Sequence, residues 1–201
     1  MKTSFTLLTF ITALLLSSFA LIDPLTIGSA LPKADKKLKD VSGAATSLKE
    51  STGKNGLLVM FSCNTCPYVI KNQQRTNAVC SYAKQNGFGV VIVNSNEGNR
   101  ESEESFEAMK TYATEQQYKW NYVMDGESEL ANAFGANRTP ECFLFNKELK
   151  LVYHGAIDNN PSDEHNVSRK HLQIALDEVI SGKDVSVKET KSVGCGIKRK
   201  G

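Results

Sequence analysis

The chain of 201 residues is 40% hydrophobic and 23% charged, a composition typical of a globular protein that excludes a largely disordered one. Its length suits one domain, or two at most. The net charge of +2 predicts no broad basic surface, so we expect no nucleic acid partner.

The N-terminal stretch differs from the rest of the chain. Residues 3–22 carry no charge, and Ser18-Phe19-Ala20 offers small residues where a signal peptidase needs them. The pattern predicts a signal peptide over residues 1–20. The alternative is an uncleaved signal anchor, because about 20 apolar residues can span a bilayer. We therefore expect bacterial export to the periplasm or medium, with the membrane contacted only through this segment.

A lead-in and two buried strands come next. Residues 21–38 are broken by proline and glycine and predict an extended lead-in to a domain over residues 39–184. The apolar runs Leu57–Phe61 and Val90–Val93 have the length of strands that are buried on both faces. Between them, residues 67–85 predict a helix that ends near Gly87.

The second half of the domain predicts alternating short elements. We expect a helix over residues 105–117, and we interpret the acidic residues before it as a solvated face. A strand at 122–125, a helix at 127–134, a hairpin of 142–145 with 149–153, and a last helix at 172–180 follow. Residues 185–201 are expected to form a C-terminal tail. The acidic residues are Glu97, Glu101, Glu103 and Glu104.

The segment Cys63-Asn64-Thr65-Cys66 is the strongest functional signal. A buried strand precedes it and Pro67 follows it, which places both cysteines at the first turn of a helix. Unpaired N–H groups and the helix dipole favour a thiolate there. The pair therefore predicts a redox-active dithiol, in which Cys63 is the more exposed attacking thiolate and Cys66 resolves the mixed disulfide. A zinc half-site, an inert disulfide and two core cysteines are the alternatives.

The order of elements, the dithiol and Thr139-Pro140 before the hairpin resemble the redoxins of the thioredoxin-like superfamily, which also contains the alkyl hydroperoxide reductases and thiol-specific antioxidant peroxiredoxins. Gly194-Cys195-Gly196-Ile197-Lys198 resembles the end of some redoxin-domain proteins. The resemblance implies a thioredoxin-like α/β fold, with helices on both faces of a central mixed sheet. It also implies catalytic Cys63 and Cys66, and a cis bond at Pro140 beside which Thr139 binds an extended substrate.

Some residues depart from this pattern or have two interpretations. Met60 stands where thioredoxins carry a buried aspartate, so we assign no general base. Cys80 and Cys142 lie among apolar residues and are expected to be core thiols. Cys195 lies among lysines and an arginine, whose charges would favour a thiolate. It is either a candidate accessory redox cysteine or a tail cysteine without a role.

The leading function hypothesis is an exported thiol-disulfide oxidoreductase that exchanges disulfides with protein substrates and is supplied by a reducing partner. A peroxidase is the first alternative, but Cys63 and Pro140 replace the threonine and arginine of peroxiredoxins. A copper chaperone is the second, with His154 as a ligand, although we place His154 at the far end of the hairpin. We expect no cofactor and no metal site.

Overall fold

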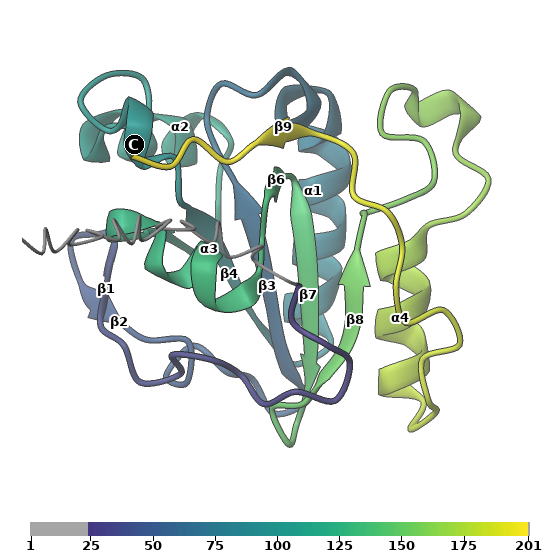
Figure 1. The fold of residues 1–201 in the computed structure, drawn as a ribbon. Coiled ribbons are helices and arrows are strands. Elements are labelled where there is room, and N and C mark those ends of the chain that lie inside the picture. Colours follow the sequence, from purple (N-terminus) through teal and green to yellow (C-terminus); the bar gives the residue numbers. More distant parts are fainter. Residues whose placement is uncertain (1–23, 201) are drawn as a thin grey trace, which may run out of the picture.

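The computed structural model describes residues 24–200 (Figure 1). The predicted signal peptide over residues 1–20 lies outside the described residues. Within the described part of the chain, no helix combines the length and the apolar character that crossing a bilayer requires.

A seven-stranded sheet in the order β2-β1-β5-β4-β3-β7-β8 forms the centre of the molecule (Figure 1). β3 runs parallel to β4, and β4 runs parallel to β5, whereas β7 is antiparallel to β3 and β8 is antiparallel to β7. The sheet is therefore mixed. Its strands are β1 (Leu38–Asp40), β2 (Ala45–Thr46), β3 (Gly56–Ser62), β4 (Phe88–Asn94), β5 (Asn121–Met124), β7 (Glu141–Asn146) and β8 (Leu151–Gly155).

Helices cover both faces of this sheet. On one face, α1, α2 and α4 pack around a core that includes Met60 and Ile92. On the other face, α3 packs with the N-terminal lead-in over Phe61 and Val91. Neighbouring residues of one strand thus enter opposite cores, which explains the continuous apolar runs. The helices are α1 (Pro67–Gln85), α2 (Phe106–Glu115), α3 (Glu129–Phe134) and α4 (His171–Ile180), with short 3-10 turns η1 (Glu97–Asn99), η2 (Gly126–Ser128) and η3 (Glu164–Asn166).

The structure confirms the expected α/β architecture and the long elements. The predicted helix over residues 67–85 coincides with α1, and the two apolar runs are the centres of β3 and β4. Gly135 ends α3 in the left-handed conformation with φ 66°, which a glycine adopts without steric cost. The short strands β1, β2, β6 (Arg138–Thr139) and β9 (Cys195–Gly196) were not predicted, since two or three residues carry no periodicity.

The C-terminal segment does not leave the body of the protein. β9 crosses above the sheet in Figure 1 and pairs antiparallel with β6, with Thr139 opposite Cys195. Beyond it, Ile197 is buried in the core that contains α3, and the Arg199 side chain donates to the Ala136 carbonyl oxygen at 2.6 Å. The segment expected to be a tail is therefore bound along its last residues to the domain.

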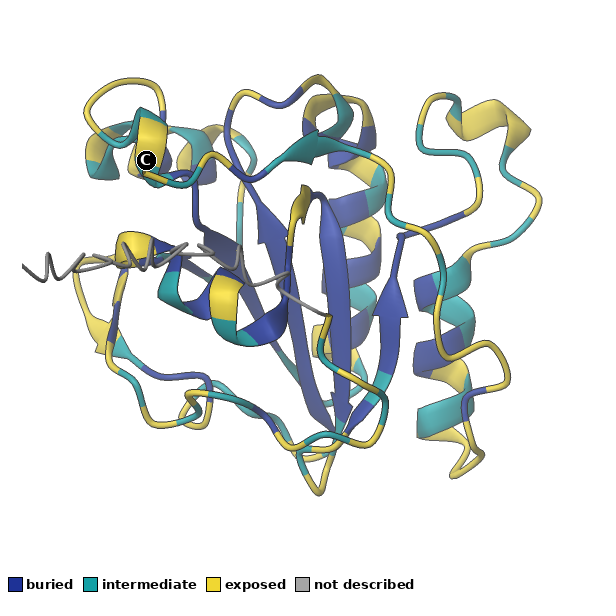
Figure 2. Ribbon diagram, in the orientation of Figure 1, coloured by how far each residue is buried: buried dark blue, intermediate teal, exposed yellow. Residues whose placement is uncertain are grey.

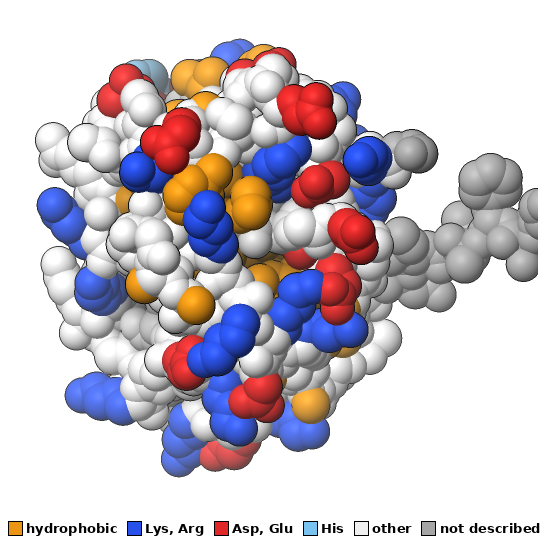
Figure 3. All heavy atoms as spheres, turned by 90° about the vertical axis from the view of Figure 1, so that its left-hand side faces the viewer, with side chains coloured by type: hydrophobic (Ala, Val, Ile, Leu, Met, Phe, Trp, Pro, Cys, Tyr) orange, Lys and Arg blue, Asp and Glu red, His pale blue; other side chains and the backbone are white. Residues whose placement is uncertain are grey.

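Buried residues lie mainly on the central strands, and charged residues of both signs lie on the surface. Figure 2 shows the central strands buried along their length, whereas exposed residues gather on loops and outer helix faces. On the face seen in Figure 3, basic and acidic side chains are interspersed and apolar ones form only small patches. That face offers no continuous basic surface.

Candidate active site

The dithiol lies where β3 ends and α1 begins. Cys66 is the N-cap residue of α1, and Pro67 follows at the first helical position, where its missing N–H costs no hydrogen bond. Both cysteines are buried, with Cys63 1% exposed and Cys66 4% exposed. The expectation that Cys63 is the more exposed of the two is wrong, because the end of β3 is enclosed and Cys66 begins the helix at the edge of this enclosure.

Thr139 contacts both sulfur atoms. Its hydroxyl oxygen lies 3.4 Å from Cys63 Sγ. Its carbonyl oxygen lies 3.3 Å from Cys66 Sγ and accepts a hydrogen bond from the Cys66 thiol when that thiol is protonated. The Thr139–Pro140 peptide bond is cis, as the resemblance implied. The structure therefore brings the four candidate residues Cys63, Cys66, Thr139 and Pro140 together, although 73 positions separate Cys66 from Thr139 in the sequence.

A buried carboxylate holds the loop between the two cysteines. Glu104 has no solvent-exposed surface, and its oxygens accept from the Asn64 backbone N–H at 3.0 Å and from the Thr65 hydroxyl at 2.9 Å. Asn94 Nδ2 donates to the same carboxylate at 2.6 Å. The interpretation of the acidic residues as a solvated face is thus wrong for Glu104. Sequence reasoning missed it because the segment has the pattern of a surface loop, in which Glu101 and Glu103 are indeed exposed and Glu97 is half-buried.

A tyrosine and an asparagine extend this network below the dithiol. Tyr122 is fully buried on β5 and its hydroxyl donates to Asn64 Oδ1 at 2.8 Å. Asn94 Nδ2 lies 2.9 Å from the same tyrosine oxygen. Burial, together with the nearby Glu104 carboxylate, raises the pKa of Tyr122 well above its ordinary value. Tyr122 therefore stays protonated and fixes the orientation of the Asn64 side chain.

The two thiols of the dithiol differ in acidity. A hydrogen bond from the Cys63 thiol, with further hydrogen bonds from Cys195 and from the Val69 N–H of the first turn of α1, lowers the pKa of Cys66. The same hydrogen bond, burial and the Glu104 carboxylate raise the pKa of Cys63. These directions favour Cys66 as the thiolate of the pair, whereas the sequence predicts Cys63, and the identity of the attacking sulfur stays a prediction. The position of Cys66 at the N-cap adds to this effect, because the N–H groups of the first turn of α1 lie close to its sulfur.

Cys195 lies at the dithiol. It packs against the cluster of Cys63, Cys66 and Val69, and together with both cysteines it lines a shallow cavity of about 200 Å³. Burial and the adjoining Cys66 sulfur raise the pKa of Cys195, although Lys198 acts in the opposite direction. Lys198 thus acts as expected of the basic tail, but burial and the Cys66 sulfur outweigh its effect on the pKa of Cys195.

His154 also differs from its expected place. It lies on β8 opposite Phe143, on which its ring stacks at 4.4 Å between centroids, and thus at the end of the hairpin that adjoins Pro140. Its Nε2 bonds the buried Glu141 carboxylate at 2.7 Å. That carboxylate also accepts from the Asn137 N–H at 2.9 Å. His154 therefore supports the loop before Pro140, and its ring is engaged there.

The two remaining cysteines are core residues, as predicted. Cys80 on α1 and Cys142 on β7 have no exposed surface and pack in the same core, and burial raises the pKa of both thiols. All five cysteines, which lie within the described residues, are free thiols. Residues 24–200 contain no group of three or more histidine, cysteine or acidic side chains that could hold a metal ion.

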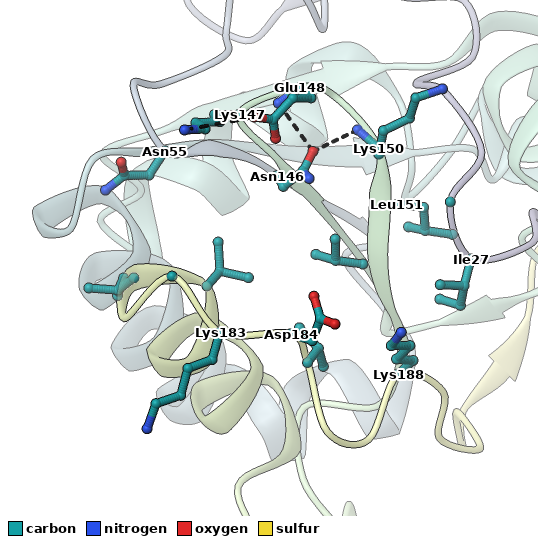
Figure 4. Close-up of a pocket in the computed structure, with 16 residues that line it drawn as sticks. Ile27, Asn55, Asn146, Lys147, Glu148, Lys150, Leu151, Lys183, Asp184 and Lys188 are labelled. Atoms are coloured by element: carbon teal, nitrogen blue, oxygen red, sulfur yellow. Dashed lines mark hydrogen bonds and ion pairs between the residues drawn. The ribbon is translucent and has the colours of Figure 1, made fainter.

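A further cavity lies away from the dithiol. It has a volume of about 570 Å³ and is lined at the turn between β7 and β8 by Lys147 and Lys150, and after α4 by Lys183 (Figure 4). In Figure 4 the Asn146 side chain bonds the turn itself, accepting from the Lys150 N–H at 2.9 Å, whereas the lysine side chains extend outward. Nothing in this arrangement provides a reactive group, so we place the chemistry at the dithiol.

Comparison with known proteins gives a family and a fold. The Redoxin family model matches residues 26–170. A hypothetical protein of Sinorhizobium meliloti 1021 is 32% identical, with a TM-score of 0.80 over 89% of this chain and 97% of that one. An uncharacterized conserved protein of Geobacillus kaustophilus is also 32% identical, with a TM-score of 0.80 over 87% of this chain and 93% of that one.

A more distant structure shares the fold alone. A putative thiol:disulfide interchange protein DsbE of Chlorobium tepidum is 18% identical, with a TM-score of 0.57 over 79% of this chain and 97% of that one. The expected thioredoxin-like fold is thereby confirmed. No curated protein matches the chain.

Proposed function

The chain belongs to the Redoxin family, and from this premise we propose that it is a thiol-disulfide oxidoreductase whose reactive pair is Cys63 and Cys66. One observation carries the proposal: two cysteines at the start of α1 both contact Thr139 beside a cis proline, and one of them has a lowered pKa. A thiolate next to a second thiol is what disulfide exchange requires.

In the proposed reaction, the Cys66 thiolate attacks a sulfur of a protein disulfide and forms a mixed disulfide, releasing the other substrate sulfur. Cys63 then loses its proton and attacks Cys66, which closes the Cys63–Cys66 disulfide and frees the reduced substrate. The two electrons and two protons pass from the enzyme dithiol to the substrate. A reducing partner restores the dithiol by the reverse exchange. The Glu104 network holds the loop, so the two sulfurs stay adjacent in both states.

We further propose that the protein works after export, in the periplasm or outside the cell. The support is the uncharged stretch over residues 3–22, which has the pattern of a signal peptide. An oxidising compartment supplies disulfides to exchange, which a cytosolic protein rarely meets. The test is to express the full chain in a bacterium and locate it by fractionation. Recovery in the cytoplasm with residues 1–20 still attached would contradict this part of the proposal.

The peroxidase alternative has less support. The cavity over Cys66 is lined by Thr65, Asn96, Asn99 and Lys198, and no arginine of the described chain lines it. Arg138, the arginine nearest in sequence, donates to the Gly194 carbonyl oxygen at 3.4 Å. The arginine of peroxiredoxins therefore has no counterpart among the described residues that line the cavity over Cys66.

Insulin reduction with dithiothreitol as electron source tests the proposed reaction. We expect the wild type to accelerate precipitation of the insulin B chain, and Cys63→Ser and Cys66→Ser each to fall to the rate of dithiothreitol alone. Cys142→Ala removes a core thiol and should retain activity. A wild type no faster than dithiothreitol alone, or one that consumes hydrogen peroxide far faster than it reduces insulin, would overturn the proposal.

A further inference from the structure

A third sulfur lies at the dithiol, on a segment that the reaction proposed above does not use. Cys195 reaches the pair because β9 aligns it with Thr139, the residue that contacts both sulfurs of the dithiol. The segment is anchored beyond Cys195 by the Ile197 N–H, which donates to the Asn137 carbonyl oxygen at 3.1 Å, and by the buried Ile197 side chain. The placement is therefore built into the fold.

Cys195 is more exposed than Cys63 and Cys66. Cys63 and Cys66 are 1% and 4% exposed, which leaves their sulfurs almost inaccessible to a protein disulfide from outside. Cys195 is partly exposed and lies at the surface of the same cavity. A disulfide entering or leaving this site thus meets Cys195 first, unless the C-terminal segment moves away.

The segment also occupies the backbone edge that the resemblance assigned to substrate. Thr139 already pairs with Cys195, so an extended substrate strand cannot pair there while β9 is in place. The chain's own C-terminal strand takes the position expected for a substrate, and it presents a cysteine to the dithiol as a substrate would.

We propose that Cys195 is a third redox cysteine, which carries the disulfide between the buried Cys63–Cys66 pair and protein thiols outside. The proposal rests on the disulfide exchange proposed above. It makes Cys195 the residue that contacts the substrate and Cys66 the residue that contacts Cys195.

Each step is a thiol-disulfide exchange that conserves atoms and electrons. In the reducing direction, Cys195 loses its proton and attacks one sulfur of the substrate disulfide, and the other sulfur leaves and is protonated. Cys66 attacks the Cys195 sulfur, which forms Cys66–Cys195 and releases the second substrate sulfur as a thiol. Cys63 then attacks Cys66, which forms Cys63–Cys66 and returns Cys195 to the thiol. The oxidising direction is the reverse.

Two variants displace Cys195 in different ways. Cys195→Ser removes the sulfur and keeps the segment. Gly194→Ala keeps the sulfur and moves the segment, because a Cβ at residue 194 would lie 2.1 Å from the Thr139 carbonyl oxygen. Gly196→Ala is the matched control on the other side of Cys195, since the nearest atom to its Cβ is the Asn137 oxygen at 4.0 Å.

The first test is a cross-link. Cys63→Ser is incubated with oxidised glutathione and digested without reductant, and its peptides are analysed by mass spectrometry. We expect a Cys66–Cys195 disulfide as the main product, with Cys80 and Cys142 as free thiols. If Cys66 and Cys195 carry only glutathione and no cross-link forms, the proposal is overturned.

The second test is the rate of insulin reduction. We expect Cys195→Ser and Gly194→Ala to slow it at least about tenfold, which corresponds to about 1.4 kcal/mol, and Gly196→Ala to stay within about twofold of the wild type. Equal or faster rates in the first two variants would overturn the relay, and faster rates would identify β9 as a barrier to substrate.

The two proposals fail in different ways. Loss of insulin reduction in Cys63→Ser and Cys66→Ser but not in Cys195→Ser leaves the oxidoreductase standing and removes the relay. A wild type that cannot reduce insulin removes the oxidoreductase, and the cross-link in Cys63→Ser then decides whether Cys195 exchanges with Cys66.

Discussion

At about pH 6 we expect Cys66 to be a thiolate in nearly every molecule, whereas less than about 1% of an ordinary cysteine of pKa 8.5 is ionised at this pH. The cause is the hydrogen bond from the Cys63 thiol, with further support from the first turn of α1. A lowered pKa means that the thiolate persists as the pH falls and disappears only on acidification through the lowered value. The ultraviolet absorbance of the thiolate, followed from neutral to acidic pH, measures this.

The other cysteines do not obscure this titration. The pKa values of Cys63, Cys80, Cys142 and Cys195 are all raised, chiefly by burial or by the bond to Cys66, so only Cys66 should lose absorbance on the acidic side. Cys66→Ser should abolish the acidic transition. Its persistence in that variant, or its absence in the wild type, would contradict the assignment of the thiolate.

A variant of Cys63 tests whether its thiol lowers the pKa of Cys66. Cys63→Ala removes the S–H donor, and we expect the midpoint of the Cys66 titration to rise by at least about one pH unit, equivalent to about 1.4 kcal/mol. Cys80→Ala alters a thiol that does not contact the dithiol and should leave the midpoint in place. An unchanged midpoint in Cys63→Ala would show that the Cys63 thiol does not set the acidity of Cys66.

Replacing the carboxylate under the dithiol loop should destabilise the protein strongly. Glu104→Ala leaves the Asn64 N–H, the Thr65 hydroxyl and Asn94 Nδ2 without their acceptor. Because each buried donor that loses its partner costs about 1–3 kcal/mol and three donors are affected, we expect a loss of about 3–5 kcal/mol in the free energy of unfolding. Urea denaturation measures it.

The neighbouring acid is the control for this variant. Glu103 is exposed, and the loop uses only its backbone carbonyl oxygen, which accepts from Asn64 Nδ2 at 2.8 Å. Glu103→Ala keeps that oxygen and should leave the urea midpoint unchanged. Equal midpoints for Glu103→Ala and Glu104→Ala would mean that the buried carboxylate does not hold the loop.

Much of the fold could be predicted from local pattern. The apolar runs of β3 and β4 identify strands with both faces covered, and Pro67 and Gly87 mark the limits of α1. These signals depend on contiguous residues. The two-residue strands β6 and β9 contain too few residues for a period, and they exist because distant segments meet.

The site divides in the same way. Contiguous residues are enough to predict that two cysteines begin a helix after a buried strand, since their spacing and Pro67 fix this locally. Two further features depend on contacts between distant segments. Glu104 is buried beneath the loop, and Cys195 reaches the dithiol. Acidity and burial depend on what surrounds a group in space, and these neighbours come from β5, the turn before α2 and the C-terminal segment.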